Sequence, residues 1–171
     1  MYEKKTMLGI RVYNFANQYG IQKSTVHTII NSYIDYCKEL LLKGIKVDFL
    51  GLCSLVPDYK VDSFNRTLAY DCKILSDILG LPTHTVFVVI NEYLMSIKDE
   101  VLSGKPASIR GIVTLKPIYV EDTLTKVHSS ISLSLKKLIE ERNTLVSSIR
   151  VHTSKILKFE VKGSGLNEFE A

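Results

Sequence analysis

The side chains best suited to catalysis or metal binding are four histidines and three cysteines: His27, His84, His128, His152, Cys37, Cys53 and Cys72. The histidines show no ligand spacing and no neighbouring nucleophile motif, and the cysteines are odd in number without a close pair. No phosphate-binding glycine loop and no suggestive carboxylate pair is present. We therefore expect no enzymatic activity, no metal, no cofactor and no disulfide framework, and we interpret the cysteines as buried small apolar residues.

Lysine and arginine form the second group that could define a function, because they can bind the phosphates of nucleic acid. The sequence has 22 basic and 18 acidic residues, a formal net charge of +4, and the charges are spread along the chain. Seven basic residues are candidate nucleic-acid contacts: Lys4, Lys5, Lys43, Lys46, Arg150, Lys155 and Lys158. Because the basic residues are scattered, any DNA binding is expected to be weak, insensitive to sequence and steeply lost with salt.

A duplicated unit must position these side chains. The stretch from Gly20 to Tyr59 recurs without a gap from Gly80 to Tyr119, 60 residues later. The positions identical in both copies are, numbered in the first, Gly20, Thr25, Val26, Ile30, Asn31, Tyr33, Lys38, Leu42, Gly44, Gly51, Leu55, Pro57 and Tyr59. A fold shared by the two copies is the economical explanation.

Each copy predicts a long helix, a glycine and two short strands. In the first copy, apolar residues from Val26 to Leu41 recur at steps of three and four, which places them on one stripe of a helix. Gly44 then ends the helix, and even spacing around a corner at Gly51 predicts the strands. A shorter helix over residues 6–19 precedes the long one, so the copy begins with a helical hairpin.

The two halves are expected to pack on one another. Residues 68–79 predict the matching short helix of the second copy, and the connector over residues 60–67 is too brief to be a floppy linker. Each hairpin alone has a bare apolar stripe and too few residues for a stable core. We therefore predict an intramolecular pair in which Tyr33 and Tyr93 are buried and their hydroxyl groups have partners.

Three segments carry a family resemblance. Residues 44–55, with Gly44, Val47 and Gly51, resemble the segment from strand one to strand two of the HU and integration host factor family; residues 104–115 match it more loosely. Residues 149–158 are similar to the return strand of that family and to its closing helix start. The resemblance implies an α+β fold of two tandem HU-like units, each a helical hairpin plus a short β-hairpin, that form an intramolecular pseudo-dimer.

The sequence also departs from that family. Cys53 and Val113 stand where the family has the second glycine of a Gly-Phe-Gly motif. HU-type proteins bend DNA with a basic β-arm whose tip carries a wedging proline. The first copy has almost no room for such an arm, and the second has room after Val120 but no proline there.

We divide the chain into a first repeat (residues 1–60), a second repeat (61–120), an extension completing the second unit (121–162) and a flexible tail (163–171). In the extension, Ile131, Leu133 and Leu135 alternate before a helical pattern, which predicts a strand leading into a short helix. A charged edge strand follows, and its apolar residues are the proposed assembly contact: Leu157, Phe159 and Val161.

Composition and resemblance together suggest a function. The sequence is 46% hydrophobic, with no signal-peptide core and no apolar run of the ~20 residues that would span a membrane. Divergent HU-like chains of this kind resemble structural proteins of crAss-like tailed phages, which implies a ring subunit near the portal and tail. Its partners would be copies of itself and other virion proteins. Such a protein would be made in the host cytoplasm and reside in the virion.

The alternative is an architectural DNA-binding protein of the HU type, which would bind without sequence specificity in the cytoplasm or nucleoid. The absent arm motif and the dispersed charge favour the structural hypothesis over this alternative.

Overall fold

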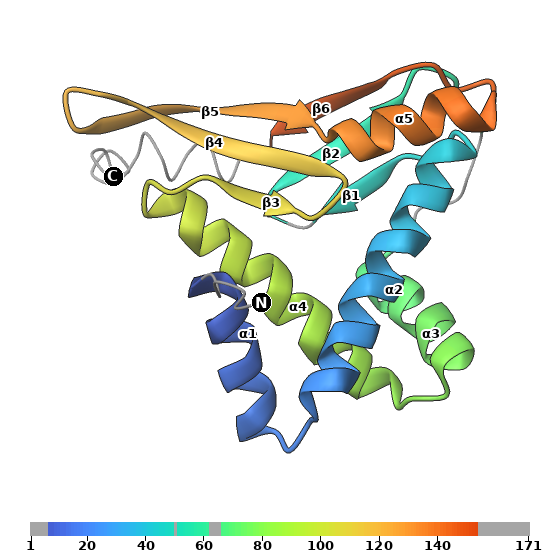
Figure 1. Cartoon of the computed structure of the whole chain (residues 1–171), viewed down its shortest axis with the longest axis vertical. Helices are drawn as coiled ribbons and strands as arrows, with labels where there is room; N and C mark the ends of the chain where they lie inside the picture. The colour runs from blue at the N-terminus through green and yellow to red at the C-terminus, as the bar shows by residue number, and fades with distance from the viewer. Residues whose placement is uncertain (1–6, 50, 62–65, 154–171) are drawn as a thin grey trace, which may run out of the picture.

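The protein has a mixed α+β fold in which most of the helices lie below a layer of strands (Figure 1). The computed structural model describes residues 7–49, 51–61 and 66–153. The helices in these residues are α1 (Met7–Gln18), α2 (Lys23–Leu42), α3 (Leu68–Leu79), α4 (Thr83–Leu102) and α5 (Leu133–Arg142). The strands are β1 (Val47–Phe49), β2 (Cys53–Pro57), β3 (Ala107–Ile109), β4 (Val113–Val120), β5 (Thr123–Ile131) and β6 (Ile149–Thr153). They form two antiparallel sheets of order β1-β2-β6 and β3-β4-β5.

The sequence duplication is also visible in the order of the elements. The series α1, α2, β1, β2 recurs as α3, α4, β3, β4, and both α2 and α4 have 20 residues. The glycines after the long helices, Gly44 and Gly104, have φ of +90° and +95°, a conformation that costs glycine little. A Cβ atom at Gly44 would lie 2.8 Å from the backbone carbonyl oxygen of Tyr59, and a Cβ atom at Gly104 would meet the side-chain hydroxyl of the equivalent Tyr119. Equivalent residues therefore close both units.

The copies are interlocked rather than placed side by side. α1 packs more extensively against α4 of the other copy than against its own neighbour α2. The β1–β2 corner at Gly51 lies on α4, because a Cβ atom at Gly51 would lie 3.8 Å from the Cδ atom of Lys98. The equivalent corner at Gly111 lies on α2, next to Lys38. The two copies thus exchange equivalent contacts, as predicted for a pair that packs within one chain.

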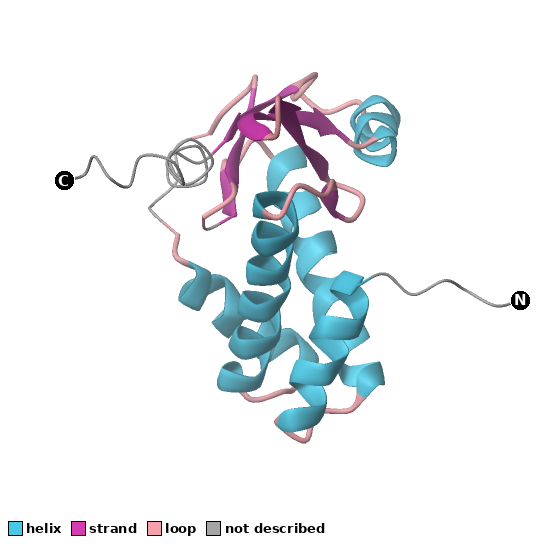
Figure 2. Cartoon of the chain, turned by 90° about the vertical axis from the view of Figure 1, so that its left-hand side faces the viewer, coloured by secondary structure: helices cyan, strands magenta, loops and turns pink. Residues whose placement is uncertain are grey.

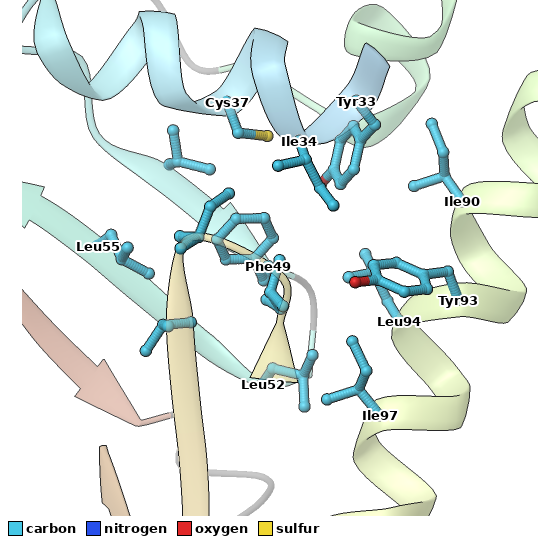
Figure 3. Close-up of a cluster of buried hydrophobic side chains, with 14 of the residues drawn as sticks. Tyr33, Ile34, Cys37, Phe49, Leu52, Leu55, Ile90, Tyr93, Leu94 and Ile97 are labelled. Carbon is cyan, nitrogen blue, oxygen red and sulfur yellow. The ribbon is translucent and has the colours of Figure 1, made fainter. Parts of the chain in front are cut away.

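A single core lies between the long helices and the sheets. Leu52 and Ile112, which follow the corner glycines, are fully buried. Figure 3 shows Leu52 of the first copy next to Ile97 of α4, from the second copy. Tyr33 and Tyr93 are also buried, as predicted, and the hydroxyl of Tyr93 accepts a bond from the backbone N–H of Arg110 at 3.2 Å. Burial raises the pKa of Tyr33 well above its usual value.

The residues after Val120 are divided between the two sheets, which differs from expectation. β5 pairs with β4 and extends the second sheet, whereas β6 pairs with β2 of the first copy, with Val151 opposite Leu55. The physical reason is that β1 covers only one edge of β2, and Ile149 and Val151 pack against the core from the other. The extension over residues 121–162 was expected to complete the second unit; β5 does extend the second sheet, whereas β6 adds the third strand of the first sheet.

The predicted strand leading into a helix is present, with a different boundary. β5 ends at Ile131, and the Oγ of Ser132 accepts a bond from the backbone N–H of Leu135 at 3.3 Å, which caps α5. Leu135 is buried, whereas Leu133 is 67% exposed. Both leucines therefore belong to the helix, and their alternation with Ile131 does not continue the strand.

Candidate interaction surfaces

The structure describes three of the ten residues proposed as contacts from the sequence. Seven lie outside the described residues: Lys4, Lys5, Lys155, Leu157, Lys158, Phe159 and Val161. Lys43 and Lys46 are exposed and lie together where α2 leads into β1. Arg150 is exposed on β6, on the face of the strand opposite the half-buried Ile149 and Val151. Arg150 thus lies on a strand face, opposite Val56, and the two lysines lie at a helix end.

The surroundings of the two lysines form a patch that we name the basic corner: Lys43, Lys46, Tyr59, Lys60 and Val61. The backbone N–H of Val61 donates to the carbonyl oxygen of Gly44 at 3.0 Å, which ties the segment after β2 to the end of α2. All three lysines are exposed, as are Tyr59 and Val61. Lys60 was missed in the sequence because only this tertiary contact brings it to the end of α2.

The carboxylates near the basic corner already have partners. Asp48 lies 3.7 Å from the ammonium nitrogen of Lys46. Asp58 accepts bonds from the hydroxyl of Ser147 and from the backbone N–H groups of Ser147 and Ser148, at 2.8 and 3.1 Å. These bonds lower the pKa of Asp58 to about 2. Asp58 thus holds the end of β2 to the segment that enters β6.

A two-stranded ribbon extends from the second sheet, and we name it the arm: residues 116–128 of β4 and β5. β3 pairs only with residues 113–115 of β4, so in the part of the chain that the structure describes the rest of β4 pairs with β5 alone. Figure 1 shows this ribbon projecting from the strand layer at the end away from α5. The room for an arm noted in the second copy is thus used.

The tip of the arm is acidic and partly apolar. Glu121 and Asp122 form the turn with φ of +53° and +66°, the left-handed pair of a two-residue hairpin loop. Before the turn, Tyr119 and Val120 are 45% and 54% exposed. No lysine or arginine lies between Tyr119 and Thr123. The tip therefore lacks both the positive charge and the proline expected of a DNA-bending arm.

A third surface is the face of the strand layer that points away from the helices. β5 and β6 contact one another, so the two sheets lie side by side in one layer (Figure 2). Basic groups at exposed alternate positions of this layer are Lys116, Lys126, His128, Arg150 and His152. In the register, Lys116 faces His128, and the remaining positions include small hydroxyl residues such as Ser130. This surface could hold phosphate groups. Of its basic residues only Arg150 was proposed from the sequence; the others were missed because strand pairing, which the sequence does not specify, brings them onto one face.

A buried polar network joins the two copies. The guanidinium group of Arg66 donates to both carboxylate oxygens of Asp71, at 3.1 and 3.4 Å, and also to the carbonyl oxygen of Lys46 at 3.0 Å. The hydroxyl of Tyr36 donates to the same carboxylate at 2.8 Å. Burial and this bond raise the pKa of Tyr36 well above its usual value. The network fixes the start of the second copy on α2 of the first and on Lys46, the residue before β1.

A further ion pair ties α5 to the first copy. Arg142 at the end of α5 donates two bonds to the carboxylate of Glu39 on α2, at 3.2 and 2.8 Å. This bidentate geometry fixes the orientation of both side chains. The contact places α5, the last described helix, on the long helix α2 of the first copy.

His27 and the three cysteines have structural surroundings. The ring of His27 lies edge-on to Tyr13, with 5.1 Å between the ring centres, and bonds to its hydroxyl group. All three cysteines are buried, as predicted, and burial raises the pKa of Cys53 to about 12 and that of Cys72 to about 11. Within the described ranges, no group of three or more histidine, cysteine, aspartate or glutamate side chains could hold a metal ion. None of the described helices is long and apolar enough to cross a membrane.

Comparisons of the chain with protein-family models, with curated proteins and with solved structures find no match.

Proposed function

We propose that this protein is a non-enzymatic structural protein that works as a repeated subunit of a larger assembly. The observation that carries the proposal is that the two ends of the molecule expose different surfaces. The copies bury their apolar faces on one another inside one chain, so further association must use other surface. That surface differs between the ends, because the second copy carries the arm and the first carries the basic corner.

The arm supports binding to protein rather than to DNA. Its tip exposes apolar Tyr119 and Val120 next to Glu121 and Asp122, and carboxylates repel phosphates. An exposed aromatic and an aliphatic side chain on a projecting hairpin are suited to a protein contact.

The resemblance to HU-like structural proteins of crAss-like phages extends this proposal to a virion. In that setting the subunit would belong to a ring near the portal and tail, with copies of itself and other virion proteins as partners. The underlying fold would be a pair of HU-like units in one chain. The interlocked copies and the arm-bearing second sheet are compatible with that fold.

Removal of the arm tests the proposal. Replacement of residues 118–126 by Asn-Gly retains the pairing of Pro117 with Val127 and closes the hairpin with a favoured two-residue turn. The shortened protein is expected to unfold cooperatively, as judged by circular dichroism, and to lose assembly in mass photometry and electron microscopy. Assembly of the shortened protein to the wild-type extent, or a wild-type protein that stays monomeric alone and with co-expressed neighbours, would contradict the proposal.

A second candidate function is sequence-nonspecific DNA binding by the outer face of the strand layer, because its basic groups come from both sheets. Lys116 and Arg150 lie on different sheets and both are exposed. The variants Lys116→Glu and Arg150→Glu should each weaken binding and reduce the slope of log affinity against log salt by about 1. Fluorescence anisotropy with a labelled DNA duplex of arbitrary sequence measures the affinity and its salt slope. A slope that neither variant changes would exclude DNA binding by this face.

A further inference from the structure

We infer that the acidic tip of the arm of one copy docks on the basic corner of a second copy, so that chains associate head to tail. This inference rests on the proposed assembly function and goes further, because it names the partner and the two surfaces. The tip comprises Tyr119, Val120, Glu121 and Asp122.

The two surfaces lie at opposite ends of the strand layer. In Figure 1 the β4–β5 turn is at one end, and the α2–β1 junction lies at the other, next to the C-terminal end of α5. The duplication explains this placement, because equivalent sheet ends point in opposite directions in an interlocked pair. Among the described residues, a ribbon extends from the end of the second copy, whereas in the first copy Asp58 bonds to Ser147 and Ser148 immediately beyond the β2–β6 pairing.

The charges of the two surfaces are complementary. The tip carries two carboxylates, both at exposed positions, and the basic corner carries Lys43, Lys46 and Lys60. Three carboxylates lie near the corner, but a net positive charge remains: Asp48 pairs with Lys46, Glu39 pairs with Arg142, and the ionised Asp58 offsets only one of the two other lysines. Opposite charges on the two surfaces favour encounter and set the register of docking.

The apolar groups of the two surfaces also match. Tyr119 and Val120 are about half exposed at the tip, and Tyr59 and Val61 are exposed at the corner. Burial of such side chains supplies the attraction that surface charges alone do not, because exposed ion pairs contribute little.

A contact between the tip of one copy and the corner of another is more favourable than a contact between two tips. Two tips would place four carboxylates together, and such like-charge contacts are unfavourable. The tip-to-corner contact uses different surface on each partner, so it is heterologous and adds subunits until a ring closes or a filament grows. Because one hairpin tip buries little area, each contact is expected to be weak, salt-sensitive and dependent on protein concentration.

Charge exchange provides the test, with the full-length chain measured by sedimentation velocity at low and high salt. Reversal of the tip (Glu121→Lys with Asp122→Lys) and reversal of the corner (Lys43→Glu with Lys60→Glu) should each weaken association about tenfold or more. An equal mixture of the two variants should associate again, because every tip then meets a corner of opposite charge. The controls Asp35→Lys with Asp77→Lys, and Lys136→Glu with Lys137→Glu, change the net charge equally at other exposed sites and should leave association unchanged.

A further variant separates docking from folding of the arm. Glu121→Asn with Asp122→Gly removes both charges and introduces the residues that this turn type favours. The hairpin should become more stable while association falls. The head-to-tail contact would be overturned if the tip and corner reversals left association unchanged, or if their mixture stayed dissociated. The proposed assembly function would still hold in either case if particles formed. A wild-type chain that stays monomeric by itself would overturn this contact, and failure to assemble with co-expressed neighbours would also remove the proposed function.

Discussion

At the scale of single residues, the strongest constraint is the buried pair of Arg66 and Asp71. Their side chains are only 11% and 8% exposed, and the carboxylate also accepts the bond from Tyr36. A buried charge without its partner is costly, so this pair specifies how the second copy begins on the first.

Loss of the arginine should therefore destabilise the protein. Arg66→Ala leaves the Asp71 carboxylate buried without its cation, and we expect a loss of about 3 kcal/mol in the free energy of unfolding. The control is Lys73→Ala, on the same helix, whose pair with Asp77 is 64% and 66% exposed and should contribute less than about 1 kcal/mol. Urea denaturation measures both, and equal small losses would show that the buried pair contributes little.

Asp58 predicts a dependence of stability on acid. Its pKa in the folded protein is about 2, below its ordinary value of 3.8, because Ser147 and Ser148 donate to the carboxylate. A lowered folded-state pKa contributes stability that is complete above about pH 4 and is lost as the pH falls towards 2. Asp58→Asn and Ser147→Ala should each reduce the loss of stability between pH 4 and 2 in urea titrations. If both variants lost as much stability between pH 4 and 2 as the wild-type protein, groups other than Asp58 would cause the acid sensitivity.

At the scale of elements, the glycines that follow helices are not equivalent. Gly20 follows α1 with φ of +69° and open space around it, whereas a Cβ atom at Gly44 would lie 2.8 Å from the carbonyl oxygen of Tyr59. The first position requires only a left-handed conformation, and the second requires that conformation and space.

Alanine substitution should separate these two requirements. Gly20→Ala is expected to cost about 1 kcal/mol, the conformational term for an ordinary residue. Gly44→Ala should cost more, because the backbone contact with Tyr59 must also open. Thermal unfolding compares the two variants. Equal shifts in Tm would show that Tyr59 moves away from residue 44 with no measurable loss of stability.

At the scale of the whole molecule, the last described strand makes the first sheet depend on the end of the chain. β6 pairs with β2 through five residue pairs, from Cys53 opposite Thr153 to Pro57 opposite Ile149. The first copy therefore acquires its third strand only after the second copy has been made. The two copies are expected to fold as one cooperative unit.

A truncation after Arg142 tests that dependence. It removes β6 and Val146, which is 1% exposed, and exposes the edge of β2. Hydrogen exchange should show lost protection in β1 and β2, with greater protection kept in β3, β4 and β5. Unchanged protection of β2 would mean that the first sheet is stable with two strands alone.

Sequence alone determined the local elements and their repetition. Periodic apolar residues predicted the helical hairpins, and the glycines at 44, 51, 104 and 111 marked the ends and corners that the structure has at those positions. The burial of Tyr33, Tyr93 and the cysteines was also predictable, because these residues share a stripe or strand face with other apolar residues. Such features are local in sequence, since a helix repeats every 3.6 residues and a strand every two.

Only the tertiary structure decided which distant surfaces meet. A strand pattern does not name its partner, so neither the pairing of β6 with β2 nor the long β4–β5 ribbon followed from alternation of apolar residues. The basic corner likewise depends on the contact of Val61 with Gly44, and the outer basic face depends on strand register. Charges scattered along the sequence become surfaces only when backbone pairing brings them together, because the sequence spacing of charged residues does not specify their separation in the folded chain.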